Sequence, residues 1–191
     1  MSKKGLLVVI SGPSGVGKGT VRDEFMKNKD LNLVYSVSMT SRNMRPGEVD
    51  GRDYFFVSRE EFEKAIAEDK LLEWTEFVGN YYGTPLDYVE KLRNEGKNVL
   101  LEIEVEGAMN VKRKCPDALT IFITPPSMEE LERRIRGRRT EAEEIVQQRL
   151  AKAEREMTQV GQYKYVICND DVSLAAELIT VIIRRYMEYD A

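Results

Sequence analysis

The sequence of 191 residues predicts an α/β fold in which a parallel sheet carries helices on both faces. Short apolar runs rich in β-branched residues alternate with longer segments of helical periodicity, which is typical of buried parallel strands joined by helices. The first apolar run leads directly into a glycine-rich stretch with a lysine, the order expected around a phosphate-binding loop. Two polar stretches break the alternation and indicate excursions from the sheet.

The elements can be placed along the chain in order. Strands are expected at residues 6–10, 98–105, 119–124 and 163–168. Helices are expected at residues 18–28, 84–96, 127–137, 141–158 and 172–188. The last helix has an apolar stripe at Leu174, Leu178, Val181 and Ile182, the pattern of a helix side that faces a core. We therefore expect one domain over residues 5–185, with a core of residues 5–34, 84–126 and 151–185 and excursions at residues 35–83 and 127–150.

Composition excludes several classes of function. Histidine is absent, so no imidazole base, Ser-His-Asp triad or histidine-ligated zinc site can exist within the chain. The net charge of -4 argues against a nucleic-acid partner. Cys115 and Cys168 are far apart and are expected as free thiols in a reducing compartment. The first apolar run is too short for a signal peptide or a membrane span, so we expect a cytoplasmic protein with no membrane partner.

The stretch SGPSGVGKGT contains the pattern G-x-x-x-x-G-K at Gly12, Gly17 and Lys18. In such a loop, backbone N–H groups converge on phosphate oxygens, the following helix adds its positive end, and the lysine reaches the β- and γ-phosphates. The alternative is a glycine-rich turn with a surface lysine. The expected contacts to a nucleotide phosphate are Gly12, Pro13, Ser14, Gly15, Val16, Gly17, Lys18, Gly19 and Thr20.

Gly19 stands where a magnesium-binding hydroxyl is usual in such loops. Our hypothesis is that Thr20 contacts the α-phosphate while Mg²⁺ is held mostly by water and nucleotide oxygens, since this ion keeps its waters readily. The Lys-Gly-Thr order resembles the loop of adenylate-kinase-like phosphotransferases more than that of GTPases. The guanine-reading N-K-x-D motif of GTPases is also absent.

The second excursion is rich in arginine. Arg133, Arg134, Arg136, Arg138, Arg139 and Arg149 lie among six glutamates. A solvated charged helix is one interpretation. The other is a lid whose arginines stabilise the charge that spreads over the oxygens of a transferring phosphoryl group. Phosphoryl transfer rests on positioning and electrostatics, so the lack of histidine is no obstacle.

The first excursion has the residues of an acceptor site. Arg42 and Arg45, with the hydroxyls of Ser38 and Tyr54, predict a pocket for a second phosphate-bearing molecule. Further along, Glu73, Tyr82 and Thr84 lie close in sequence. Guanine presents N1–H and N2–H₂ as adjacent donors, so a carboxylate is its natural partner, whereas adenine offers no such pair.

Over residues 5–185 the chain resembles the guanylate kinases, which transfer the γ-phosphate of ATP to GMP. The resemblance rests on an ordered set of segments: GPSGVGKGT, SVSMTSRNMRPGE, GRDYFF, LEWTEFVGNYYGTP, LEIEVEG, GRRTEAEE and NDD. It implies a P-loop NTPase-type core with a GMP-binding subdomain (35–83) and a helical lid (127–150). It also implies ATP with Mg²⁺, GMP and dGMP as ligands, in a monomer or a homodimer.

The resemblance also implies roles for individual residues. Lys18 and the loop would bind the ATP phosphates, and Asn169 would lie near adenine. The GMP phosphate would be held by Ser38, Arg42, Arg45, Tyr54 and Tyr82. The guanine would be read by Glu73, Gly83 and Thr84, with help from Glu102 and Glu104. The transferring phosphoryl group would be clamped by Lys18, Arg42, Arg134, Arg138 and Arg149.

The segment LEIEVEG departs from the family, because Glu104 and Glu106 stand where aspartate and glutamine are usual. Glu102 and Glu104 are expected on one face of a strand, at the carboxyl edge of the sheet where α/β ligands bind. They would contact guanine or water-bound magnesium, or form a structural surface pair. Two other functions stay open: a kinase of this fold with another acceptor, either another nucleotide or a phosphorylated sugar, and an inactive scaffold that binds protein ligands.

Overall fold

The computed structural model describes residues 3–137 and 142–189, and it confirms the predicted α/β fold. The main sheet has five parallel strands in the order β2-β7-β1-β8-β9. Its strands are β1 (Leu7–Ser11), β2 (Leu33–Tyr35), β7 (Asn98–Glu102), β8 (Leu119–Thr124) and β9 (Tyr165–Cys168). Among the described residues, no helix has the length and apolar character needed to cross a bilayer.

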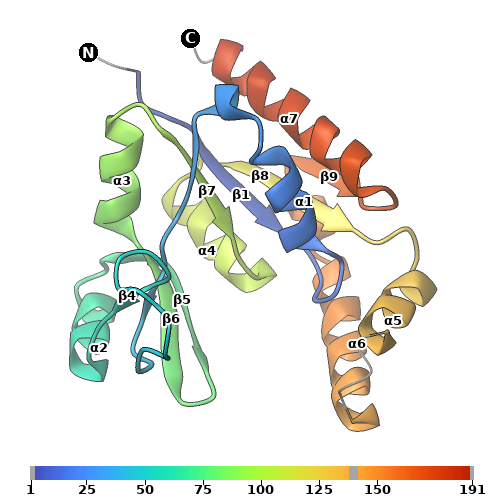
Figure 1. The fold of residues 1–191 in the computed structure, drawn as a ribbon, viewed down its shortest axis with the longest axis horizontal. Helices are drawn as coiled ribbons and strands as arrows, with labels where there is room; N and C mark the ends of the chain where they lie inside the picture. Colours follow the sequence, from blue (N-terminus) through green and yellow to red (C-terminus); the bar gives the residue numbers. More distant parts are fainter. Residues whose placement is uncertain (1–2, 138–141, 190–191) are drawn as a thin grey trace.

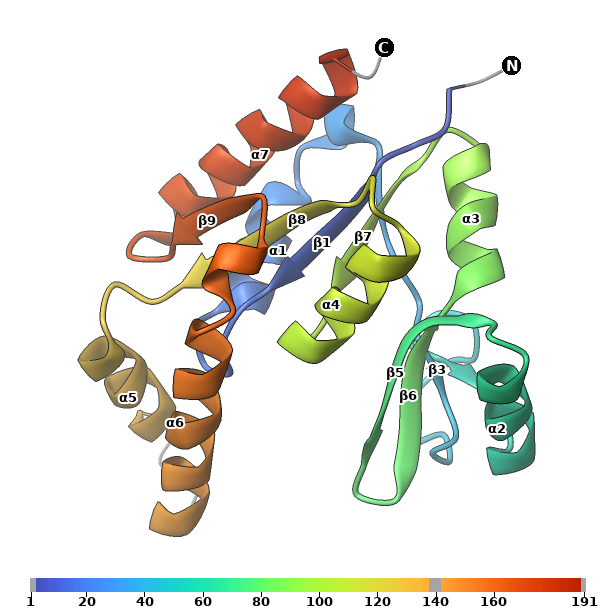
Figure 2. The ribbon, with the colours of Figure 1, turned by 180° about the vertical axis from the view of Figure 1, so that it is seen from behind.

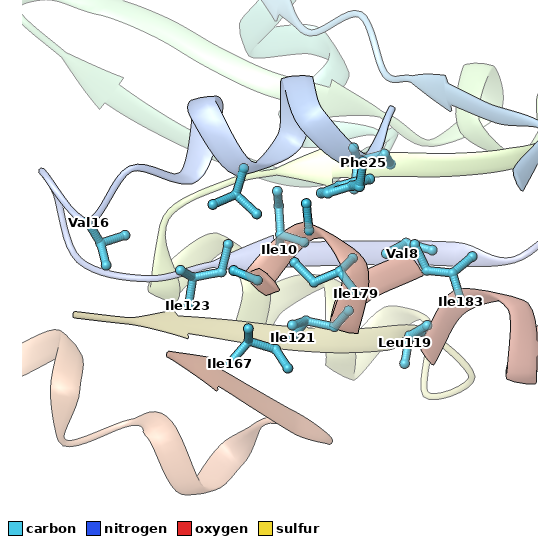
Figure 3. Packing of buried hydrophobic residues seen from close by; sticks show 14 of the residues in the cluster. Val8, Ile10, Val16, Phe25, Leu119, Ile121, Ile123, Ile167, Ile179 and Ile183 are labelled. Carbon is cyan, nitrogen blue, oxygen red and sulfur yellow. The ribbon is translucent and has the colours of Figure 1, made fainter. Parts of the chain in front are cut away.

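Alternate side chains of the sheet enter two separate apolar cores. Val8 and Ile10 of β1 belong to one cluster, and Leu7 and Val9 belong to the other, because successive strand residues point to opposite faces. Figure 3 shows the first cluster, where β1 and β8 side chains meet Ile179 and Ile183. The central strands of the sheet, β1, β7 and β8, are therefore buried on both faces, as the continuous apolar runs predicted.

Helices cover both faces of the main sheet (Figures 1 and 2). The helices α1 (Lys18–Phe25) and α7 (Val172–Tyr189) pack against each other over one face. The helices α3 (Leu86–Asn94) and α4 (Val105–Lys114) cover the other face. Short 3₁₀ turns occur at Lys29–Leu31 and Val160–Gln162.

A second, mixed sheet lies in the first excursion, where the sequence indicated only polar, turn-rich chain. Its strands pair in the order β4-β3-β6-β5, with β3 (Met39–Thr40), β4 (Phe55–Phe56), β5 (Leu71–Phe77) and β6 (Asn80–Pro85). The helix α2 (Arg59–Ala67) begins with a capping box between Ser58 and Glu61, and its Phe62 is fully buried. Figure 2 shows this unit below α3 and beside α4, which its strands contact.

The second excursion forms two helices, α5 (Met128–Arg136) and α6 (Glu143–Met157). They project on the other side of the main sheet's carboxyl edge from the second sheet (Figure 1). Arg138 and Arg139, both expected in this segment, lie outside the described residues. The carboxyl edge of the main sheet is thus flanked by two excursions. Each also contributes to an apolar core: Leu131 and Val146 of the second excursion belong to one cluster, and Leu72 of the first belongs to the other.

Two expectations are corrected by the structure. Most of the apolar stripe expected on the last helix does not face the core: Leu174, Leu178 and Val181 are 56%, 43% and 54% exposed. Ile182, the fourth residue of the stripe, is partly buried and packs against the core as expected. The buried side has Ala175, Ala176, Ile179 and Ile183 instead. Both sets have helical spacing, so the pattern alone could not choose between them, and the two small alanines let the helix approach α1 and the sheet closely.

The second correction concerns Glu104. It does not share a strand face with Glu102, because β7 ends at Glu102 and Glu104 is the residue before the first turn of α4. The sequence reading extended the strand through residue 105, since the helix that begins there has no N-terminal capping side chain to reveal it.

Candidate active site

A cleft of about 700 Å³ opens between the carboxyl edge of the main sheet and the second sheet. The main sheet and its loops contribute Gly12, Ser14, Lys18, Glu102, Ile103 and Glu104. The second sheet and its approach contribute Ser38, Tyr54, Glu73, Tyr82 and Gly83. Residues predicted for donor and acceptor binding from distant parts of the sequence therefore line one cavity.

The loop between β1 and α1 has a conformation that only glycine adopts easily. Gly12 and Gly17 have φ of +151° and +94°, where side chains are strained. A Cβ at Gly12 would also overlap the carbonyl oxygen of Ile123, and one at Gly17 would lie 2.8 Å from Nδ2 of Asn169. These glycines allow the loop to turn tightly around the space in front of α1, as anion cradles require.

Lys18 folds back onto this loop. Its ammonium donates to the carbonyl oxygens of Gly12 at 2.7 Å and Pro13 at 3.1 Å. Burial lowers the pKa of Lys18, and the nearby Glu102 carboxylate opposes that change. The lysine thus holds a position at the mouth of the loop, and its carbonyl contacts can be exchanged for phosphate oxygens.

Two arginines of the second excursion contact the loop region. Arg149 of α6 donates from Nη2 to the hydroxyl of Ser14 at 2.9 Å. Arg134 of α5 donates from Nη1 to the Asn169 carbonyl at 3.0 Å and from Nε to Glu130 at 2.7 Å. Arg133 and Arg136 instead form exposed pairs with glutamates. The solvated-helix interpretation fits these last two residues.

Asn169 lies beneath the phosphate-binding loop. It is 2% exposed, and its Nδ2 donates to the carbonyl of Val16 at 2.8 Å. Its Oδ1 is buried without a partner. The side chain therefore supports the loop from below and joins it to the end of β9.

Two of the residues predicted to bind the acceptor phosphate, Tyr54 and Tyr82, lie around Arg42, which does not itself line the cleft. Its guanidinium makes a two-pronged pair with Glu48, at 2.8 and 3.0 Å, and lies over the rings of Tyr54 and Phe56. This pairing with Glu48 raises the pKa of Arg42. Tyr54 and Tyr82 are in edge-to-face contact, at 6.0 Å between ring centres. Arg45 is exposed and does not line the cleft, although its backbone N–H donates to Glu48.

Glu73 is a buried carboxylate on β5, 9% exposed, opposite Thr84 of β6. The Thr84 hydroxyl donates to Oε1 at 2.6 Å. Burial raises the pKa of Glu73, and this hydrogen bond partly offsets the rise. Gly107 of α4 makes room for the carboxylate, since a Cβ there would lie 2.9 Å from Oε2.

The two carboxylates discussed for magnesium are each paired with a cation. Glu102 accepts from Arg22 at 2.6 Å, and Glu104 accepts from Lys152 at 2.8 Å. Thr20 is exposed and does not line the cleft. Within residues 3–137 and 142–189, no group of three or more acidic or cysteine side chains is arranged to hold a metal ion. The side chains of the described residues therefore do not form a carboxylate site for magnesium of their own.

Several site residues were missed by sequence reasoning. Arg22, Gly107, Asn110 and Glu156 all contact or line the site. Gly107 lies within the segment LEIEVEG, but nothing in the sequence showed which side chain it faces. Arg22 reads as an ordinary helix charge, since its partner is 80 positions away.

The fold and the cleft define a nucleotide phosphotransferase built on a phosphate-binding loop. A family model described as guanylate kinase matches residues 4–186. The chain is 57% identical to a guanylate kinase of Bacillus cereus (strain ZK / E33L), over 95% of this chain and 89% of that one. It is 56% identical to a guanylate kinase of Streptococcus thermophilus (strain CNRZ 1066), over 96% and 88%.

Comparison with a solved structure also indicates a guanylate kinase. The crystal structure of guanylate kinase from Anaplasma phagocytophilum is similar with a TM-score of 0.73 and 35% identity, over 97% of this chain and 88% of that chain. This chain belongs to the guanylate kinase family, and its activity is the phosphorylation of GMP to GDP.

Proposed function

We propose that this chain transfers the γ-phosphoryl group of ATP to GMP and to dGMP. The proposal rests on one cleft that has Lys18 on one side and Glu73 on the other. A loop for nucleotide phosphates and a buried carboxylate for a base face the same space. Donor and acceptor can then meet in line without a covalent enzyme intermediate.

Guanine is the base that fits the acceptor side. Glu73 already accepts one hydrogen bond from Thr84, and the carboxylate has acceptor capacity left for the adjacent N1–H and N2–H₂ donors of guanine. Adenine would present a lone pair at N1 to this carboxylate, which is repulsive. The proposed contacts are to the base and the phosphate, so dGMP should serve as well as GMP.

The acceptor phosphate would be bound by Arg42 with the hydroxyls of Ser38, Tyr54 and Tyr82. Arg42 is held in place by Glu48 and by two aromatic rings, so its guanidinium is ordered before the phosphate arrives. Arg45 is exposed next to this group and would contribute only after movement of its loop.

Lys18, Arg134, Arg138 and Arg149 would stabilise the transferring phosphoryl group. The support for Arg149 is its hydrogen bond to Ser14, which brings a lid cation to the donor loop. Charge of this kind is worth most where water is excluded, so we propose that the lid and the acceptor unit close over the substrates.

Magnesium would enter as the complex with ATP. Because the described residues form no metal site of their own, the ion would be held by nucleotide oxygens and water. We further propose a cytoplasmic location, where Cys115 and Cys168 would stay reduced, in keeping with their being free thiols.

An acceptor panel tests the proposal. ADP release from ATP is measured with GMP, dGMP, AMP, UMP and ribose bisphosphate at equal concentration. We expect GMP and dGMP to be used and the others to give background rates. A preference for AMP or for the sugar phosphate would contradict the guanine assignment. GMP binding without ADP release would instead indicate an inactive scaffold.

A further inference from the structure

Gly19 does not need to be glycine for steric reasons. Unlike Gly12 and Gly17, it is not among the glycines with positive φ. A Cβ built there would meet its nearest atom, Nη2 of Arg22, at 3.6 Å and Oε1 of Glu102 at 3.9 Å, which are ordinary contacts. A serine at this position would therefore fit. The missing side chain is a chemical feature of the site, not a consequence of packing.

The space beside Gly19 is occupied by an ion pair. Arg22, one turn further along α1, donates from Nη1 to Oε2 of Glu102 at 2.6 Å, and both side chains are mostly buried. The Arg22 guanidinium also lies 4.8 Å from the ring centre of Tyr35, at the end of β2. Asp23 accepts its other N–H groups. Arg22 is thus fixed from three sides.

The ion pair with Arg22 matters chiefly for what the Glu102 carboxylate can bind. Glu102 ends β7, beside the phosphate-binding loop, and it lines the cleft. A hydroxyl at position 19 together with an unpaired carboxylate at position 102 would offer a divalent cation two hard oxygen ligands, the kind that Mg²⁺ prefers. In this chain the hydroxyl is absent and the carboxylate accepts from a guanidinium.

We propose that Arg22 is a positioning residue whose guanidinium takes the place of a metal ion at Glu102. It holds Glu102 beside Gly19, so that the loop binds magnesium only as the nucleotide complex. This inference rests on the proposed use of Mg²⁺ with ATP. It goes beyond that proposal because it assigns a role to Arg22. It also predicts that the two positions are coupled.

Metal binding by the nucleotide-free protein tests the coupling. Mn²⁺ serves as the probe, and its free fraction is measured by electron paramagnetic resonance with wild type, Gly19→Ser, Arg22→Ala and the double variant. We expect wild type and Gly19→Ser to bind no Mn²⁺ at the loop. The double variant should bind it at least about tenfold more tightly than either single variant, because it alone has both the hydroxyl and the freed carboxylate.

Two controls separate positioning from a purely structural role. Arg22→Lys keeps a cation near Glu102 and should leave Mn²⁺ binding as in wild type. Arg184→Ala, on α7, removes an exposed pair with Asp30 of the 3₁₀ turn and should change nothing. A merely structural Arg22 would lower the melting temperature in Arg22→Ala without coupling to position 19.

The outcomes are distinct. Nucleotide-free wild type that binds Mn²⁺ as tightly as the double variant would overturn the inference, and so would Gly19→Ser alone matching the double variant. If the double variant does not fold, wild type alone decides: Mn²⁺ should bind with a non-hydrolysable ATP analogue present and not without it. ADP release by wild type with GMP is measured separately, so a failure of the proposed function is recognised independently.

Discussion

The hydroxyl of Thr84 donates to the Glu73 carboxylate at 2.6 Å, across neighbouring antiparallel strands of the second sheet. This pair is buried, and Gly107 of α4 supplies the space that the carboxylate needs. A carboxylate is costly to bury without full hydrogen bonding, so the free protein holds it at some expense in stability. That expense is explained if the remaining acceptor capacity serves a ligand.

Glu73→Gln should weaken GMP binding. The amide keeps the shape of the side chain but places a donor or a neutral acceptor against the N1–H and N2–H₂ of guanine. We expect the KM for GMP to rise by about 10- to 100-fold, in line with the loss of charge-assisted hydrogen bonds, with a smaller change in kcat. Steady-state kinetics measure this, and Glu68→Gln, on an exposed carboxylate paired with Lys70, is the control. An unchanged KM for GMP would remove Glu73 from the acceptor site.

GMP binding should weaken as the pH falls. Burial raises the pKa of Glu73, so its carboxyl is protonated at higher pH than an ordinary glutamate, and the protonated form cannot accept from both guanine donors. The KM for GMP should therefore rise on acidification through that raised pKa, and this rise should vanish in Glu73→Gln. A rise of the same size in both proteins would assign the effect to another group.

The raised pKa of Glu73 affects the stability of the ligand-free protein in the direction opposite to its effect on GMP binding: stability gains from acidification. A raised pKa means that Glu73 contributes most to stability below its unfolded-state pKa, and that this contribution is lost as the pH rises through the folded-state pKa. Glu73→Gln should therefore increase the melting temperature of the ligand-free protein near neutral pH. Thermal unfolding of both proteins at acidic and neutral pH measures it, and a lower melting temperature for the variant at neutral pH would contradict the assignment.

Gly107→Ala should displace the Glu73 carboxylate. Its Cβ would lie 2.9 Å from Oε2, closer than such atoms approach, so the carboxylate has to shift from its present position opposite Thr84. We expect a KM increase for GMP of about tenfold with little change in the KM for ATP. Gly161→Ala is the matched control, since a Cβ there meets nothing within 4 Å. Equal effects of the two variants would mean that Gly107 has no specific role.

Lys18→Ala should lower turnover by about 10² or more, because the ammonium would stabilise charge that develops on the transferring phosphoryl group. Lys29→Ala, on an exposed lysine of the 3₁₀ turn after α1, should retain wild-type activity. Full activity of Lys18→Ala would make the phosphate-loop assignment wrong.

The sequence predicted best what is local along the chain. The phosphate-binding loop lies within residues 12–20, and Gly12, Gly15 and Gly17 are needed by a backbone path that the motif itself defines. Four of the five main strands were found because a sheet buried on both faces needs continuous apolar runs. The fifth, β2, was missed, since it is an edge strand of three residues, none of them fully buried. The strand at residues 119–124 was placed with its observed bounds.

The features that the sequence did not reveal depend on contacts between distant segments. β3 and β4 have two residues each, too few for any periodicity, and they exist because they pair with each other while β3 also pairs with β6. The pairing of Arg22 with Glu102 and the space that Gly107 gives to Glu73 follow only from the packing of α1 and α4.

The most direct measurement is ³¹P nuclear magnetic resonance of a mixture of ATP, Mg²⁺ and GMP with the protein. The account predicts that the ATP γ-phosphate signal disappears while ADP and GDP form in equal amounts, with no inorganic phosphate. Release of inorganic phosphate without GDP, or no change in the ATP signals, would contradict the transfer of a phosphoryl group to GMP in this cleft.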